Sequence, residues 1–246
     1  TTTSPKNSIA VTFHLGANRL TFDALYNTRP IIKDSPMQFL LHGDSIRWSD
    51  MDIGKVSRTS WQQFWKPVWG ERKSMPDVYN QTDISFASQD SPEMEIILQC
   101  RIYEEGFGFR YHIINYGSSD HITIDEENTY FRFTDNHISY PVPRPQAEYT
   151  GKCNLNAVDY PVEHPMTIKI SDTCYVSLTT ANVVNYSRVK YEPVINMPYT
   201  FKTKLAGPVK RKLPFTTPWR VMLIANSPGQ LVENNLLSTT SIHRTK

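Results

Sequence analysis

The chain has 246 residues, of which 39% are hydrophobic and 20% are charged. This balance is too polar for a membrane protein and too apolar for a disordered chain, so we expect a soluble globular protein. Its 26 basic and 24 acidic residues give a formal net charge of +2 and form no long run of either sign. Nucleic acid and anionic lipid are therefore poor candidates for a partner, and no stretch of residues is long and apolar enough to predict a membrane span.

Alternating or β-branched apolar residues recur in short stretches along the chain, and this pattern predicts strands. In chain order the predicted strands are Ile9–Leu15, Leu20–Tyr26, Asp83–Ala87, Met94–Tyr103, Phe107–Ile114, His121–Ile124, Thr129–Phe133, Met166–Ile170, Tyr175–Leu178, Val221–Ala225 and Leu231–Leu237. Between two of them, Glu104-Glu105-Gly106 supplies turn residues and predicts a β-hairpin. No window sustains the spacing of an amphipathic helix, so helix should be scarce.

Prolines crowd into two regions, 141–165 and 193–214, and predict long extended connections at sheet edges. Many short strands without interspersed helices favour two antiparallel sheets packed face to face. We therefore predict an all-β fold, a large antiparallel β-sandwich. The sequence has three cysteines, which can form at most one disulfide. Cys100, Cys153 and Cys174 also lack the spacing of a zinc site.

Two residues are candidates for a catalytic role, but the residues around them in the sequence argue against it. Ser45 follows Gly43 and Asp44 as a trypsin-like nucleophile would, but Ile46 stands where the oxyanion-hole turn needs a glycine. His112 lies in a predicted strand and could serve as a general acid or base in a mutarotase-like sandwich. A histidine in a strand is more often simply packed or solvated.

Two carboxylate doublets, Glu104-Glu105 and Glu126-Glu127, could suggest glycosidase chemistry. Adjacent residues of a strand point to opposite faces, so neither doublet forms a two-carboxylate pair by itself. We expect each doublet to be a solvated turn or strand end.

The strongest chemical feature is a group of aromatic residues beside polar ones, namely Trp61, Phe64, Trp65 and Trp69. Flat indole rings can stack on the apolar faces of sugars. They can equally fill the sandwich core or a domain interface, and for any single tryptophan here we favour that structural role. The segment from Trp65 to Glu71 should therefore be mostly structural, with Trp65 or Trp69 packed inside the domain.

Three separate segments, in this order along the chain, resemble the amino-terminal domain of glycoside hydrolase family 97. They are Trp65–Glu71, Tyr103–Tyr111 and Thr217–Arg220. The resemblance covers nearly the whole chain, because Ser4-Pro5 is similar to the family's opening after signal-peptide cleavage and Asn234–Leu237 is similar to the strand that ends this domain. It implies a β-super-sandwich like that of galactose mutarotase over residues 1–240, with 241–246 beginning a linker.

In members of this family, the sandwich precedes a catalytic (β/α)₈ barrel that holds the catalytic carboxylates. The resemblance thus implies no catalytic residue in this chain and an oligo- or polysaccharide as the substrate of the whole polypeptide. It also implies hydrolysis of α-glucosidic or α-galactosidic bonds, a calcium cofactor, and a bacterial periplasmic or cell-envelope location. One glutamate of the sandwich reaches the family's calcium, and Glu148 in Gln146-Ala147-Glu148-Tyr149 lies at the matching place.

The leading hypothesis is a non-catalytic sandwich domain of a calcium-dependent α-glycosidase, which shapes the active-site rim and donates Glu148 to calcium. A first alternative is a free carbohydrate-binding module, which needs an exposed aromatic platform. A second is a mutarotase-like enzyme, in which His112 or another histidine must meet a carboxylate in an open pocket.

Overall fold

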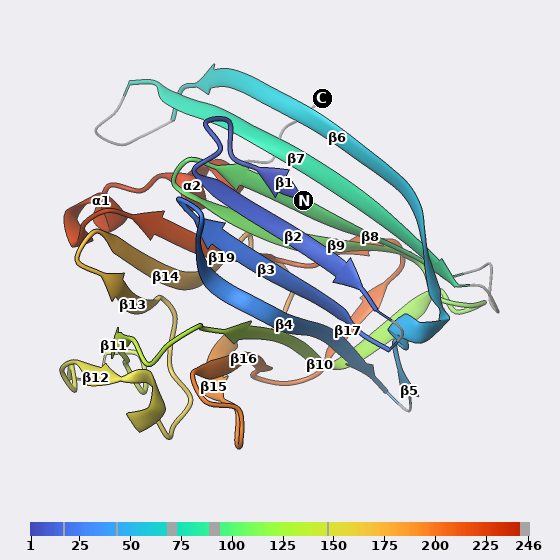
Figure 1. The fold of residues 1–246 in the computed structure, drawn as a ribbon. Coiled ribbons are helices and arrows are strands. Elements are labelled where there is room, and N and C mark those ends of the chain that lie inside the picture. Colours follow the sequence, from blue (N-terminus) through green and yellow to red (C-terminus); the bar gives the residue numbers. More distant parts are fainter. Residues whose placement is uncertain (17, 43, 68–72, 89–93, 147, 242–246) are drawn as a thin grey trace.

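The computed structural model describes residues 1–241 except 17, 43, 68–72, 89–93 and 147. Two antiparallel sheets face each other across one large core (Figure 1). The predicted all-β sandwich is therefore confirmed, and helix is confined to two short α-helices and two 3₁₀ turns of the described chain. None of its helices has the length and apolar character of a membrane span.

The first sheet has the strand order β1-β2-β3-β4-β10-β16-β15, with β17 beside β10 and β5 beside β4. Its strands are β1 (Thr2–Thr3), β2 (Ile9–Leu15), β3 (Leu20–Tyr26), β4 (Arg29–Leu41), β5 (Asp44–Ser45), β10 (His121–Arg132), β15 (Val189–Pro193), β16 (Thr200–Leu205) and β17 (Val209–Lys212). The bounds of β2 and β3 match the prediction. The predicted strand 121–124 and all but the last residue of the predicted strand 129–133 are parts of the single strand β10, which contains a register shift.

The second sheet has the order β12-β11-β13-β14-β19-β9-β8-β7-β6, with β18 beside β9. Its strands are β6 (Met51–Trp65), β7 (Met75–Ser88), β8 (Glu95–Tyr103), β9 (Gly106–Asn115), β11 (Ile138–Tyr140), β12 (Cys153–Asn154), β13 (Met166–Ser171), β14 (Cys174–Ala181), β18 (Phe215–Thr216) and β19 (Trp219–Ala225). The hairpin predicted at Glu104-Glu105-Gly106 is confirmed, because β8 and β9 pair with Tyr103 opposite Gly106.

The predicted strand 231–237 is wrong, and the similarity of Asn234–Leu237 to a final strand fails with it. Helices α1 (Pro228–Val232) and α2 (Leu236–Ser241) occupy this segment. The Ser227 side chain caps α1 by accepting a hydrogen bond from the Gln230 amide, and Pro228 favours the first turn. At α2, the Asn234 side chain accepts from the Leu236 amide at 3.0 Å. These caps outweigh a short apolar run that fits a strand equally well.

Aromatic side chains from both sheets interlock in the core. Phe22 of β3 packs edge-on against Phe109 of β9, with ring centroids 5.3 Å apart, and Phe39 of β4 meets Tyr111 of β9 at 4.7 Å. All four are at most 1% exposed. Such edge-to-face pairs stabilise the packing of the two sheets beyond the area that they bury.

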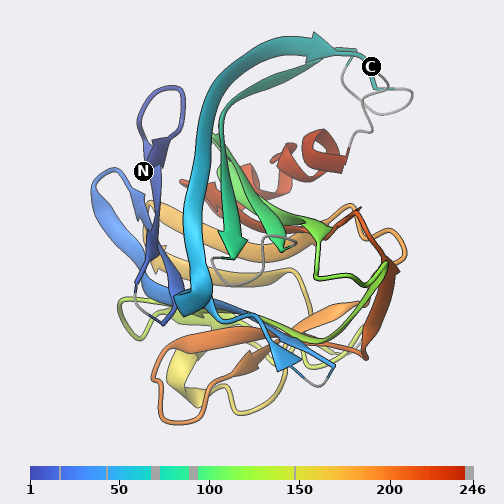
Figure 2. The same cartoon turned by 90° about the vertical axis from the view of Figure 1, so that its right-hand side faces the viewer.

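Strands β6 and β7 extend the second sheet into a curved arm that arches over α1 and α2 (Figure 2). Strand β6 is the outermost strand, and most of its residues are exposed. The predicted strand Asp83–Ala87 is part of β7. Strand β6 was not predicted, because a strand with solvent on both faces carries no alternation of apolar and polar residues.

Candidate functional site

Glu148, the predicted calcium ligand, lies in the connection between β11 and β12. Two hydrogen bonds hold the flanks of this loop: Thr150 Oγ1 donates to the Pro141 carbonyl and Lys190 Nζ donates to the Pro143 carbonyl, each at 3.1 Å. Glu148 itself is exposed and makes no hydrogen bond or ion pair with another described residue. Its carboxylate is thus accessible to a ligand from outside the domain.

Glu148 alone supplies too few oxygen ligands to bind a calcium ion tightly. Calcium takes about six to eight oxygen ligands, and one carboxylate cannot hold it tightly. Within the described ranges, no three histidine, cysteine, aspartate or glutamate side chains gather at a potential metal site. Glu148 would fit calcium only as a single donor, and the other ligands of such an ion would have to come from outside the described residues.

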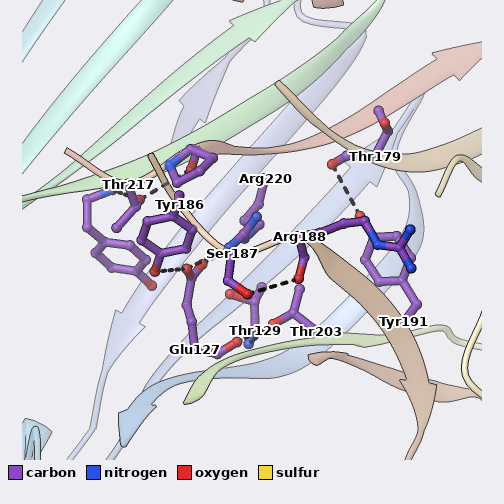
Figure 3. Close-up of polar contacts among 12 residues, drawn as sticks. Glu127, Thr129, Thr179, Tyr186, Ser187, Arg188, Tyr191, Thr203, Thr217 and Arg220 are labelled. Carbon is purple, nitrogen blue, oxygen red and sulfur yellow. Dashed lines mark hydrogen bonds and ion pairs between the residues drawn. The ribbon is translucent and has the colours of Figure 1, made fainter. Parts of the chain in front are cut away.

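A buried ion pair joins the two sheets at the centre of the sandwich (Figure 3). Arg220 of β19 donates from Nε to Glu127 Oε1 at 2.7 Å and from Nη2 to Oε2 at 2.6 Å. Both side chains are 1% exposed, and the Tyr186 hydroxyl donates to Glu127 Oε2 at 2.7 Å. The expectation that Glu126-Glu127 is a solvated strand end is therefore wrong for Glu127, which lies on the inward face of β10 opposite Arg220.

Further hydrogen bonds fix this ion pair in place. The Thr203 hydroxyl donates to the Glu127 backbone carbonyl and accepts from the Thr129 amide at 2.9 Å. Burial lowers the pKa of Arg220, whereas the charge and hydrogen bonds of Glu127, together with the nearby tyrosines, raise it, and the net shift is upward. The guanidinium therefore stays charged. Because the pair is enclosed by the core, it serves the fold and has no access to a substrate.

His112, the candidate acid or base, lies half-buried on β9, where Nδ1 is 2.8 Å from the Thr216 hydroxyl. Burial, followed by the positive charge of Arg110, lowers the pKa of His112 to about 4. A general acid or base works best with a pKa near the operating pH. His112 is neutral at pH 7, and the structure gives it a packing role.

We expect the imidazole signals of His112 in an NMR titration to shift near pH 4. Because the folded pKa lies below the unfolded value of about 6.5, His112 contributes stability that is present above pH 6.5 and is lost as the pH falls towards 4. Arg110→Gln should raise the His112 midpoint, whereas a change at the distant Arg19 should not. A midpoint near 6.5 in the unaltered chain contradicts the assigned burial.

The Glu104-Glu105 doublet forms the turn between β8 and β9, as expected. Glu104 accepts from the Lys6 amide and from the Ser8 hydroxyl. Glu105 accepts from the Asn235 amide at 3.2 Å. These bonds tie the amino terminus and the start of α2 to the turn. Each carboxylate has a structural role here.

The remaining sequence candidates divide between exposed and undescribed positions. Trp61 is 41% exposed and Phe64 is 70% exposed, so neither fills the sandwich core. Trp65 is half-buried, while Trp69 and the side chain of Ser45 lie outside the described residues. Cys100, Cys153 and Cys174 form no disulfide.

The outer face of the second sheet holds an aromatic and cationic cluster that the sequence did not reveal. The Trp219 ring has Arg110 at 4.3 Å and Arg101 at 5.0 Å from its centroid. Tyr79 lies 4.7 Å below the Arg101 guanidinium and 5.0 Å from the ring of Tyr103. Guanidinium groups stacked on aromatic faces gain cation–π attraction. We call these five residues the outer-face cluster.

Two interactions orient the arginines of the outer-face cluster. Arg101 Nε donates to Gln81 Oε1 and Arg110 Nε donates to Gln99 Oε1, each at 2.8 Å. Burial and the neighbouring Arg101 lower the pKa of Arg110 to about 10. Leu236 of α2 belongs to the same buried apolar cluster as the aromatic members, and α2 contacts β14, β19 and β9, so the last described helix lies against this face.

A family model described as the N-terminal part of glycosyl hydrolase 97 matches residues 2–241. This chain belongs to that family. The resemblance of the three segments is confirmed, and the structure explains two of them. Tyr103–Tyr111 forms the β8–β9 hairpin, and Thr217–Arg220 places Trp219 on the outer face and Arg220 in the ion pair.

Solved structures share the fold of the whole domain. A glycoside hydrolase family 97 enzyme from Pseudoalteromonas sp. strain K8, in complex with panose, is 23% identical over 96% of this chain, with a TM-score of 0.87. The enzyme in complex with acarbose is 24% identical over 91% of it, with a TM-score of 0.83. A beta-arabinopyranosidase matches 91% of the chain with 14% identity and a TM-score of 0.81.

The match extends over only part of each solved protein. This chain covers 37% of the panose complex, 35% of the acarbose complex and 40% of the beta-arabinopyranosidase. It is therefore the counterpart of one domain of a longer enzyme.

Proposed function

We propose that this domain is non-catalytic, that it shapes the active-site rim of a calcium-dependent α-glycosidase, and that it donates Glu148 to the calcium ion. The observation that carries the proposal is the exposed Glu148 carboxylate, which has no partner among the described residues and lies on a loop anchored at Pro141 and Pro143. An anchored loop positions a ligand more accurately than a free one, because its backbone has already lost its conformational freedom. The remaining oxygen ligands and the catalytic carboxylates belong to a (β/α)₈ barrel of the same polypeptide.

The carboxylates discussed above support a non-catalytic role for the chain alone. Glu127 is enclosed in the core ion pair, and Glu104 and Glu105 bind backbone amides in a turn. A glycosidase needs an acid and a second carboxylate about 5–10 Å apart on either side of the scissile bond. These three side chains are committed to the fold.

The chemistry of the ion defines what this chain adds to catalysis. A bound calcium ion would polarise a sugar oxygen as a Lewis acid and fix the orientation of the substrate. Glu148 supplies negative charge and one oxygen ligand at the rim. The family 97 enzyme solved with panose supports an α-glucoside as the substrate class of the whole polypeptide.

Glu148→Gln in the longer polypeptide should weaken calcium binding and reduce turnover of a nitrophenyl α-glucoside. The amide keeps the shape of the side chain but removes the charge that a hard cation prefers, and loss of one such contact lowers affinity by about tenfold to a hundredfold. Calorimetry with calcium and initial rates at several calcium concentrations measure both effects.

Glu233→Gln is the matched control, because Glu233 is also exposed but lies on α1's C-terminal side, away from the loop of Glu148. It should leave both quantities unchanged. If Glu148→Gln behaves like this control, Glu148 is an ordinary surface residue and the proposed calcium role is wrong.

A carbohydrate-binding module is the second candidate, favoured by the 41% exposure of Trp61 on the arm. An indole at the surface can stack on a sugar ring. Titration of this chain with panose tests this candidate. If the chain binds panose, and Trp61→Ala abolishes binding without changing the melting temperature, the domain is a carbohydrate-binding module and has more than a supporting role.

A further inference from the structure

We propose that Arg101 and Arg110, stacked on Trp219, form a carboxylate-binding site for an aspartate or glutamate of the domain that follows α2 in the longer polypeptide. The inference rests on the proposed function, because it takes that domain as its partner. It adds the surface and the chemical contact through which the two domains dock.

The hydrogen bonding of the two arginines leaves donors for such a ligand. Each guanidinium uses Nε to donate to a glutamine carbonyl. The Nη groups of Arg110 have no hydrogen-bonded partner among the described residues, and the Arg101 guanidinium has the Tyr103 hydroxyl as a neighbouring acceptor. Both guanidinium groups lie within 5.0 Å of the same indole centroid, and the positive charge of Arg101 lowers the pKa of Arg110, so the two groups are near each other. Arginine donors in a planar fork match the two oxygens of a carboxylate.

The charge balance of this face also calls for an anion. The titratable groups that act on Arg110 are Arg101, Asp83, Tyr103 and Tyr79. Asp83 accepts two hydrogen bonds from Gln81, at 3.1 and 2.9 Å, and forms no ion pair with either arginine in the described structure. Two half-buried positive charges therefore share one carboxylate, which is linked to Arg101 only through Gln81, and a further carboxylate would offset their repulsion.

The position of the cluster indicates the occupant. Leu236 of α2 belongs to the same buried apolar cluster as Trp219, Tyr79 and Tyr103, and α2 contacts β19 and β9, so any segment that follows α2 starts from this face. The arm of β6 and β7 arches over the same side of the sheet (Figure 2). This chain covers 37% of the similar panose-bound enzyme, so a longer polypeptide of that kind has further residues that can pack against this face.

The test compares hydrogen exchange of residues 99–110 and 219–223 in this chain and in the longer polypeptide. We expect slower exchange in the longer polypeptide, and we expect the double variant Arg101→Gln/Arg110→Gln to lose this protection by at least about tenfold. Arg101→Lys/Arg110→Lys should restore part of it, because lysine keeps the charge without the fork. Arg19→Gln/Arg47→Gln, which removes two exposed charges from elsewhere, should retain it.

Several results would overturn the inference. Equal exchange in the two proteins means that this face stays uncovered, and protection that survives the Gln double variant means that the contact is not ionic. If the Gln double variant speeds exchange in this chain alone as much as in the longer polypeptide, the arginines stabilise this domain and do not bind a second one. Calcium binding and turnover of the same longer polypeptide judge the proposed function separately.

Discussion

Arg220→Ala should lower the free energy of unfolding by about 3–5 kcal/mol, since it leaves the Glu127 carboxylate charged in the core without its partner. Glu127 would keep the Tyr186 hydroxyl bond at 2.7 Å but lose both guanidinium bonds. One neutral donor cannot replace the hydration that the carboxylate gives up on burial. Urea unfolding followed by tryptophan fluorescence measures the change as a lower midpoint.

The controls separate loss of the charge pair from loss of packing. Arg19 pairs with Asp34 at 3.1 Å on the surface, with side chains 59% and 37% exposed, so Arg19→Ala should cost less than about 1 kcal/mol. The double variant Glu127→Leu/Arg220→Met removes both charges and should be more stable than Arg220→Ala alone. If Arg220→Ala unfolds at the same urea concentration as Arg19→Ala, the buried pair contributes nothing to stability.

The strands that the sequence predicted well are those with one face in the core. Strands β2 and β3 bury apolar residues at alternate positions, and their predicted bounds are correct. Strand β6 has solvent on both faces, and β4 contains Pro30 and Pro36, so neither shows an uninterrupted period of two. Both escaped prediction for that reason.

The buried ion pair and the outer-face cluster could not be predicted from the sequence, because each brings together residues from strands that are far apart in the chain. Glu127 and Arg220 are 93 positions apart and meet only when the two sheets pack. Within the Thr217–Arg220 segment, the period of two sends Trp219 outward and Arg220 inward, which is visible only once β19 is known to be central. Glu148 was chosen by resemblance, and its role as a calcium ligand stays a prediction.

Gly106→Ala should be strongly destabilising, although it adds only one methyl group. Gly106 has φ +140°, and a Cβ there would lie 2.2 Å from the Met222 carbonyl oxygen of β19. Backbone strain of this kind costs about 1–3 kcal/mol by itself. The overlap adds to that cost, because the neighbouring atoms belong to a paired strand and cannot yield without separating β9 from β19.

The turn before Gly106 leaves little room for relaxation. The Glu105 carbonyl accepts from the Ile224 amide at 2.9 Å and from Asn234 Nδ2 at 2.7 Å, so the hairpin is fixed to β19 and to the segment between the helices. Gly207→Ala is the matched control: nothing lies within 4 Å of its added Cβ. It should be neutral or about 0.4–1 kcal/mol more stable. Equal urea midpoints for the two variants would show that Gly106 is not required by close strand packing, and the conformation of the β8–β9 turn would then need another explanation.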